Sequence, residues 1–144
     1  MLGRLTRWLR VLGYDTVYAP DTDDNELLRR ARAEDRILLT ADRALAARRG
    51  ARTLLIEAQD LPGQLKQVRA ELAPAGGEFS RCVACNGALV LADKSTLADR
   101  VPPYVLATQD EFRRCPDCGR IYWPGSHVER IKAMLGEWPS ADLT

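Results

Sequence analysis

The sequence predicts an α/β protein in which a parallel sheet flanked by helices is followed by a small cysteine-containing module. Helical and strand-like patterns alternate through the first half of the chain, and the composition changes at "APAGGE" (residues 73–78). Beyond this change, four cysteines occur in two closely spaced pairs. Strands that alternate with helices of this length form parallel sheets. We therefore predict one domain at residues 1–76 and a second at residues 77–144.

The first domain reads as a helix followed by three strand–helix pairs. Leucines at helical spacing predict the first helix at "LGRLTRWLRVLG", which Gly13 ends. Strands are predicted at "DTVYA" (15–19), "RILLT" (36–40) and "RTLLIE" (52–57), with helices at 23–35, 42–50 and 60–72. The consecutive aliphatic residues of "RILLT" are typical of a strand that is buried on both faces.

Composition and charge indicate which kinds of partner and which cellular location to expect. The chain has 144 residues and a formal net charge of +1, so any nucleic-acid partner must bind a local basic patch. Apolar runs near the length of a membrane span are absent from the sequence, and arginines interrupt the N-terminal apolar residues where a signal peptide would be uniform. We expect a cytoplasmic protein that does not span a membrane.

The two cysteine pairs predict a metal site. Cys82/Cys85 and Cys115/Cys118 lie in "RCVACNG" and "RCPDCGR", which look like two copies of one metal-binding turn. Four thiolates match the tetrahedral coordination of a structural Zn²⁺ ion, whereas disulfides or free thiols are the alternative. Strands of a zinc ribbon are expected at 88–91, 104–107 and 120–123, with a C-terminal helix after His127. His127 is read as a residue near the start of this helix, with a phosphate contact or a metal ligand as alternatives.

Acidic residues follow the predicted strands. Asp42 lies just beyond "RILLT", and Asp24 opens the helix before that strand. In parallel sheets the carboxyl ends of the strands meet at one edge, where clustered carboxylates can hold Mg²⁺ or Mn²⁺. Such an ion polarises a phosphate and activates water. Helix capping explains the same two positions equally simply.

Several basic and aromatic residues are candidates for contacts with nucleic acid. Arginines recur at three-residue spacing on the first helix, as in a phosphate-binding stripe or a solvated helix face. The aromatic residue after the second cysteine pair can stack on a base or pack against the ribbon. The candidates are Arg4, Arg7, Arg10, Arg43 and Trp123.

Five segments together resemble one known family. They are "MLGRLTRWLRVLGYDT", "DNELLRRA", "RILLTADRAL", "FSRCVACNGAL" and "FRRCPDCGRIYWPGSHVERI". The chain resembles the ribonuclease domain at the C-terminus of the Mut-seven exonuclease, which also occurs as separate prokaryotic proteins. This resemblance implies a PIN-like nuclease fold with an appended zinc ribbon. It also implies Mg²⁺- or Mn²⁺-dependent hydrolysis of RNA phosphodiester bonds, with Asp42 and Asp24 as catalytic carboxylates.

The sequence departs from that family at its beginning. Members usually carry a short strand with an aspartate before the segment that matches "MLG", and here Met1 is the first residue of that segment. Either the start of the chain was assigned too late, or the chain is a natural truncation for which we expect weak or no activity. The alternative function is a non-catalytic RNA-binding or protein-docking module. A structural subunit that uses its ribbon for assembly is a further alternative.

Overall fold

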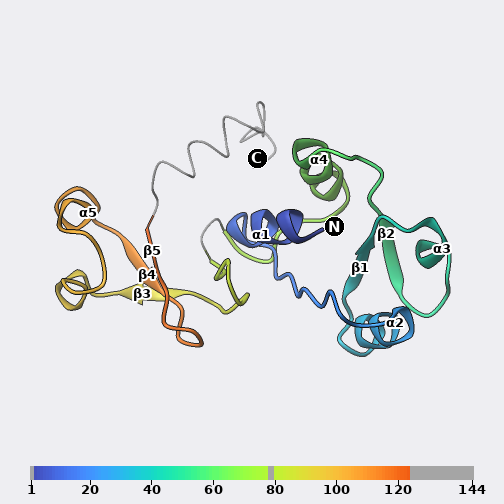
Figure 1. The fold of residues 1–144 in the computed structure, drawn as a ribbon, viewed down its shortest axis with the longest axis horizontal. Helices are drawn as coiled ribbons and strands as arrows, with labels where there is room; N and C mark the ends of the chain where they lie inside the picture. The colour runs from blue at the N-terminus through green and yellow to red at the C-terminus, as the bar shows by residue number, and fades with distance from the viewer. Residues whose placement is uncertain (1, 78–79, 124–144) are drawn as a thin grey trace. The chain divides into compact units, whose positions relative to one another are not determined.

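The computed structural model describes residues 2–77 and 80–123, and within them it is a mixed α/β protein (Figure 1). The chain divides into two compact units, Met1–Thr6 with Val17–Leu72 and Arg7–Thr16 with Ala73–Thr144. The elements, in order, are α1 (Gly3–Val11), α2 (Asp24–Ala33), β1 (Ile37–Thr40), α3 (Arg43–Ala46), β2 (Arg52–Leu55), α4 (Leu61–Glu71), β3 (Val90–Ala92), η1 (Lys94–Thr96), α5 (Pro103–Thr108), β4 (Phe112–Arg114) and β5 (Ile121–Tyr122).

Helix α1 forms where the leucine spacing predicts it. Leu5 and Leu9 are buried on the same side of the helix. Gly13 ends the helix with a positive φ of 96°, while its N–H donates to Arg10 and the N–H of Tyr14 donates to Leu9. This hydrogen-bond pattern is the Schellman motif, in which glycine is favoured because it has no Cβ. The predicted helix end is therefore confirmed.

The strand predicted at residues 15–19 does not form, and this segment has no regular secondary structure. Its backbone groups bind side chains instead of a neighbouring strand. The N–H of Thr16 donates to Oδ1 of Asn86, and the carbonyl of Thr16 accepts from Nε of Arg10, both at 2.9 Å. These bonds satisfy the backbone N–H and carbonyl of Thr16, which in a strand would bond to a neighbouring strand.

Helix α2 is capped one residue earlier than the sequence suggested. Asp23 is the N-cap, and its Oδ1 accepts from the N–H of Glu26 at 2.8 Å. Asp24 is consequently the first residue inside the helix. Leu28 and Ala31 form the buried side of α2.

Strands β1 and β2 form the predicted parallel pair and lie side by side in Figure 1. Ile37 is level with Arg52, and Thr40 is level with Leu55. The expected burial of β1 on both faces is wrong, since its aliphatic residues are only partly buried and Thr40 alone is fully buried. The physical reason is that the sheet has only these two strands within the described residues, so fewer neighbours cover them.

The helix predicted at 42–50 is much shorter in the structure, whereas the helix predicted at 60–72 forms over nearly its whole length. Helix α3 is a single turn. Gly50 lies in the loop between α3 and β2 and has a φ of 116°. Helix α4 buries Leu65 and Val68, and Gln67 donates from Nε2 to the carbonyl of Leu55 at 2.6 Å. This bond ties α4 to the end of β2.

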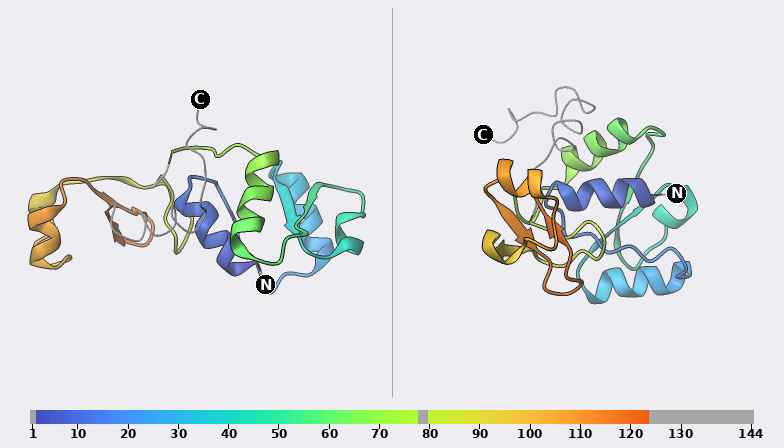
Figure 2. Two further views of the ribbon diagram at one scale, coloured as in Figure 1. Left: turned by 90° about the horizontal axis from the view of Figure 1, so that it is seen from above. Right: turned by 60° about the vertical axis from the view of Figure 1, so that its left-hand side comes forward.

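The second unit contains an antiparallel sheet in the order β3–β4–β5. Helix α5, seen at one end of this sheet in Figure 2, occupies the segment where we predicted a strand at 104–107. Pro103 explains the difference, because proline is favoured at the first position of a helix. A small core joins the sheet to α5 and consists of Leu97, Val101, Val105 and Phe112.

The predicted C-terminal helix and His127 lie outside the described residues. Within residues 2–77 and 80–123, none of the helices combines the length and apolarity needed to cross a bilayer.

Candidate functional site

The first cysteine loop is a tight turn held by its own backbone. The N–H of Cys82 donates to the carbonyl of Gly87, and the N–H of Asn86 donates back to the carbonyl of Cys82, both at 2.8 Å. Asn86 has a positive φ of 70°, which asparagine tolerates better than most residues. The turn thus brings the Cys85 side chain back towards Cys82.

The second cysteine loop repeats this geometry. The N–H of Cys115 donates to Arg120 at 2.9 Å, and the N–H of Gly119 donates to Cys115 at 2.8 Å. Gly119 has a φ of 81° and takes the place that Asn86 has in the first loop. The predicted internal repeat is therefore confirmed at the level of individual hydrogen bonds.

Gly87 lies where the two cysteine loops approach each other most closely. A Cβ at this position would lie 2.7 Å from Oδ2 of Asp117 and 2.8 Å from Sγ of Cys115. A Cβ atom essentially never approaches other heavy atoms so closely, so Gly87 allows the two cysteine loops to meet.

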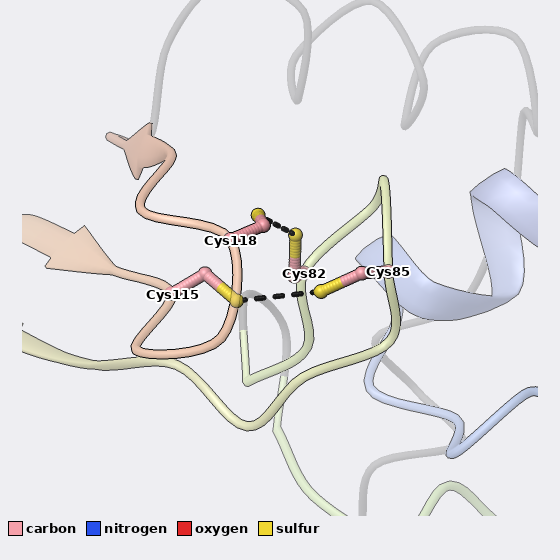
Figure 3. A group of neighbouring side chains, drawn as sticks. All are labelled: Cys82, Cys85, Cys115 and Cys118. Carbon is pink, nitrogen blue, oxygen red and sulfur yellow. Dashed lines mark hydrogen bonds between the residues drawn. The ribbon is translucent and has the colours of Figure 1, made fainter.

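The four cysteine sulfurs converge on one point (Figure 3). Sγ of Cys82 lies 3.6 Å from Sγ of Cys118, and Sγ of Cys85 lies 3.4 Å from Sγ of Cys115. All four sulfurs lie within 4.8 Å of one another, and the cysteines are free thiols rather than disulfides. Tetrahedral zinc with Zn–S bonds of about 2.3 Å separates its sulfurs by about 3.8 Å. The cluster therefore fits a zinc ion with little movement.

Neighbouring groups shift the pKa values of two of the cysteines in opposite directions. The backbone N–H and the guanidinium of Arg120 stabilise the Cys118 thiolate and lower its pKa to about 6. At Cys85 the N–H of Gly87 also favours the thiolate, but the contact with Cys115 and burial outweigh it and raise the pKa to about 12. Metal binding must therefore displace a proton from Cys85 at neutral pH.

Asp42 lies immediately beyond the carboxyl end of β1. Its Oδ1 accepts from the N–H of Ala44 at 2.8 Å and of Leu45 at 3.3 Å, so it is the N-cap of α3. Its own N–H donates to the hydroxyl of the buried Thr40 at 3.0 Å, which orients the turn. Because both capping bonds end on Oδ1, the lone pairs of Oδ2 are left for another ligand.

Asp24 is an exposed residue in the first turn of α2, where Asp23 performs the capping. The side chain of Arg48, just after α3, donates to Asn25 beside Asp24. This bond brings the start of α2 towards the short helix that Asp42 caps. The capping explanation thus holds for Asp42 and not for Asp24.

Within the described part of the chain, the cysteines are the only group of three or more potential metal-binding side chains that are this close together. A scan of the sequence against protein-family models matches the Mut7-C RNAse domain over residues 1–135. The chain belongs to the Mut7-C RNAse domain family. No curated protein and no solved structure matches it significantly. Family membership supports a nuclease-like function, and the cysteine cluster supports zinc binding by this Mut7-C domain.

The predicted arginine stripe on α1 of this Mut7-C domain is only partly exposed. Arg4 and Arg7 face solvent, as a phosphate-binding stripe requires. Arg10 is only 8% exposed, and its guanidinium is bonded to the carbonyls of Thr16 and Val83. Its assignment to nucleic-acid binding is therefore corrected, because burial and backbone bonding hold it in the protein interior.

Two further predicted contacts of the Mut7-C domain occupy different environments. Arg43 is exposed, and its Nη2 lies 3.2 Å from Oε1 of Glu57. Trp123 is half-buried and packs at a tilted angle on Phe112, with ring centroids 6.0 Å apart. The packing alternative for Trp123 is thus realised in this structure.

Glu57 is a further candidate carboxylate, which local patterns in the sequence did not indicate. Thr40 and Leu55 are paired at the ends of β1 and β2, so Asp42 and Glu57 each lie two residues beyond a paired position. Neighbouring strands are about 4.8 Å apart, which brings these two carboxylates of the Mut7-C domain to the same edge. The parallel register is the signal that would have identified Glu57.

Proposed function

We propose that the chain is a metal-dependent ribonuclease that hydrolyses RNA phosphodiester bonds at the edge of the β1–β2 sheet, in a PIN-like arrangement. The observation that carries the proposal is the position of Asp42 beyond the end of β1 in a member of a ribonuclease family. Ligands bind at this edge in parallel α/β sheets. Oδ1 of Asp42 is oriented by α3, so the carboxylate is already positioned without a metal ion.

Asp24 and Asp42 would hold the catalytic ion, and Glu57 is available as a further carboxylate. Carboxylate oxygens are the ligands that Mg²⁺ and Mn²⁺ prefer. The contact between Arg48 and Asn25 supports a shared location, because α3 is only one turn long and spans about 6 Å.

The bound ion would supply charge stabilisation at the phosphate and a water of lowered pKa. The chain's own residues bind and orient the RNA. Arg43 is suited to a phosphate because its ion pair with Glu57 is exposed, and exposed pairs contribute little. Arg4 and Arg7 offer two more exposed cations, and the zinc-binding unit would add RNA affinity.

The test is cleavage of a labelled single-stranded RNA by the zinc-loaded protein with and without added Mn²⁺. Omitting Mn²⁺ is preferable to a chelator, which would also remove the zinc. Asp42→Asn should reduce the rate on the order of 100-fold or more, since it removes a charge that holds the ion. Asp93→Asn is the matched control, because Asp93 is an exposed capping aspartate in the other compact unit and the variant should cleave at the unmodified rate.

The alternative is a non-catalytic RNA-binding or protein-docking module. The capping bonds of Asp42 favour this alternative, because they give the carboxylate a structural role that does not require catalysis. RNA binding without Mn²⁺-dependent cleavage, unchanged by Asp42→Asn, would establish this alternative and overturn the ribonuclease proposal.

A further inference from the structure

We propose that zinc at the four cysteines and the C-terminal half of α1 stabilise each other, with Arg10 and Asn86 as the positioning residues that couple them. This coupling is independent of the proposed ribonuclease activity. It concerns only residues of the second compact unit, which contains Arg7–Thr16 and the cysteine loops.

Arg10 links the helix directly to the first cysteine loop. Its Nη1 donates to the carbonyl of Val83 at 2.9 Å, and Val83 is the residue directly after Cys82. Its Nε donates to the carbonyl of Thr16, also at 2.9 Å. One guanidinium therefore holds the cysteine loop and the segment after α1 at the same time.

The charge of Arg10 complements the metal site. Burial lowers the pKa of Arg10, while the attraction of Cys82 and Cys85 opposes this effect. A buried cation is costly unless anionic groups compensate it. Four thiolates around a divalent ion carry a net charge of −2, so the zinc-bound state provides that compensation.

Asn86 makes the second link, from the residue that follows Cys85. Its Oδ1 accepts from the N–H of Thr16 at 2.9 Å, and its Nδ2 donates to Oδ1 of Asp15 at 2.7 Å. Arg81 reinforces the contact, because its Nη1 donates to the carbonyl of Asn86 at 3.1 Å. The side chain and the carbonyl of Asn86 thus both join the loop to its surroundings.

The coupling follows from how such loops fold. A cysteine loop without its ion loses the main interaction that sets its backbone. The carbonyl of Val83 and the side chain of Asn86 then lose their fixed positions, and Arg10 and Thr16 lose their partners. Thermodynamic linkage is reciprocal. If the bound ion strengthens the contacts of Arg10 and Asn86 by some factor, those contacts strengthen binding of the ion by the same factor.

The first test measures zinc affinity by competition with a chromophoric chelator, using the full chain. Arg10→Gln should weaken binding by about 10- to 100-fold, the range found for groups that support metal ligands. Arg7→Gln is the matched control, since it makes the same change at an exposed position of the same helix and should leave the affinity unchanged. Equal affinities for Arg10→Gln and the unmodified protein would overturn the proposal.

The second test measures hydrogen exchange of residues 7–16 with and without zinc. Zinc should slow exchange of this segment about tenfold or more, and α4 should be unaffected because it lies in the other compact unit. Arg10→Gln should lose most of this gain in protection. If Arg10 only stabilised the helix, the variant would exchange faster in both states while the effect of zinc remained, and this outcome contradicts the proposal.

Asn86→Gly provides a variant that keeps the backbone geometry. Glycine adopts the positive φ of Asn86 without strain, so the cysteine loop can form while both side-chain bonds are lost. The variant should weaken zinc binding and reduce the zinc-dependent protection of residues 7–16. If Asn86→Gly folds and retains both properties, Asn86 is not a positioning residue and the proposed coupling is wrong.

Discussion

The hydroxyl of Tyr122 on β5 lies 2.9 Å from Sγ of Cys82, so a strand of the ribbon directly supports a metal-binding sulfur. Burial raises the pKa of Tyr122, and the contact with Cys82 raises it further. The phenol therefore stays protonated at neutral pH and is able to donate to a thiolate at Cys82. A hydrogen bond to a thiolate stabilises its charge and orients its lone pairs.

The Tyr122→Phe change should weaken zinc binding about tenfold, because it removes this donor and keeps the ring. Competition with a chromophoric chelator measures the effect. Tyr104→Phe is the control, since Tyr104 is 72% exposed on α5 and its loss of a hydroxyl should leave the affinity unchanged. Equal zinc affinities for Tyr122→Phe and the unmodified protein would show that the hydroxyl does not support the site.

Removal of zinc should disturb the core next to the ribbon. The indole of Trp123 packs on Phe112, and Phe112 begins the strand that leads to Cys115. A chain with Trp8→Phe and Trp138→Phe would report on Trp123 alone. Chelation should shift its fluorescence to longer wavelength as the ring becomes exposed, and added zinc should reverse the shift. An unchanged spectrum after verified metal removal would mean that this core folds without the ion.

Gly13 should be among the least replaceable residues of the second unit. A Cβ on Gly13 would lie 2.3 Å from the carbonyl oxygen of Gly76 and 2.4 Å from that of Gly77. Gly13→Ala should therefore cost more than the roughly 1–2 kcal/mol expected from its positive φ alone. Gly50→Ala isolates that smaller cost, because Gly50 also has a positive φ but has open space around its Cβ position.

Urea unfolding followed by circular dichroism compares the two glycine variants. If both variants lost the same amount of stability, the close approach between Gly13 and Gly76 would not add to the cost of a side chain at Gly13. A larger loss for Gly13→Ala would show that residues 76–77 pack tightly on the end of α1, although their composition is typical of a linker.

Local patterns in the sequence predicted the elements whose interactions are themselves local. The helix α1 and the turn of each cysteine loop were predicted correctly. The parallel pairing of β1 with β2 is not local, and it was predicted from the alternation of strands with helices. The helix end at Gly13 was also recognisable, because the Schellman motif depends on a few consecutive residues.

The strand predicted at 104–107 was wrong for a local reason, Pro103 at the start of α5, whereas other errors concern residues whose partners are distant in the sequence. The segment at 15–19 has the composition of a strand, but its backbone at Thr16 is bonded to Asn86, 70 residues away. Arg10 was grouped with exposed arginines by its spacing, and its partner Val83 lies 73 residues away. Glu57 became a candidate only when the register of the strands was known. Periodicity in the sequence shows which residues share a face of a helix or strand. Only the tertiary structure shows which residues cover that face.

Two substitutions of Asp42 can separate its structural role from its proposed catalytic role. Asparagine caps helices about as well as aspartate, so Asp42→Asn should keep the bonds to Ala44 and Leu45 and unfold at nearly the same urea concentration. Asp42→Ala removes the cap and should cost about 1 kcal/mol. Because both variants lack the carboxylate, both should lose Mn²⁺-dependent RNA cleavage to a similar extent. If cleavage instead followed stability, with Asp42→Asn active and Asp42→Ala impaired, Asp42 would act only as the cap of α3.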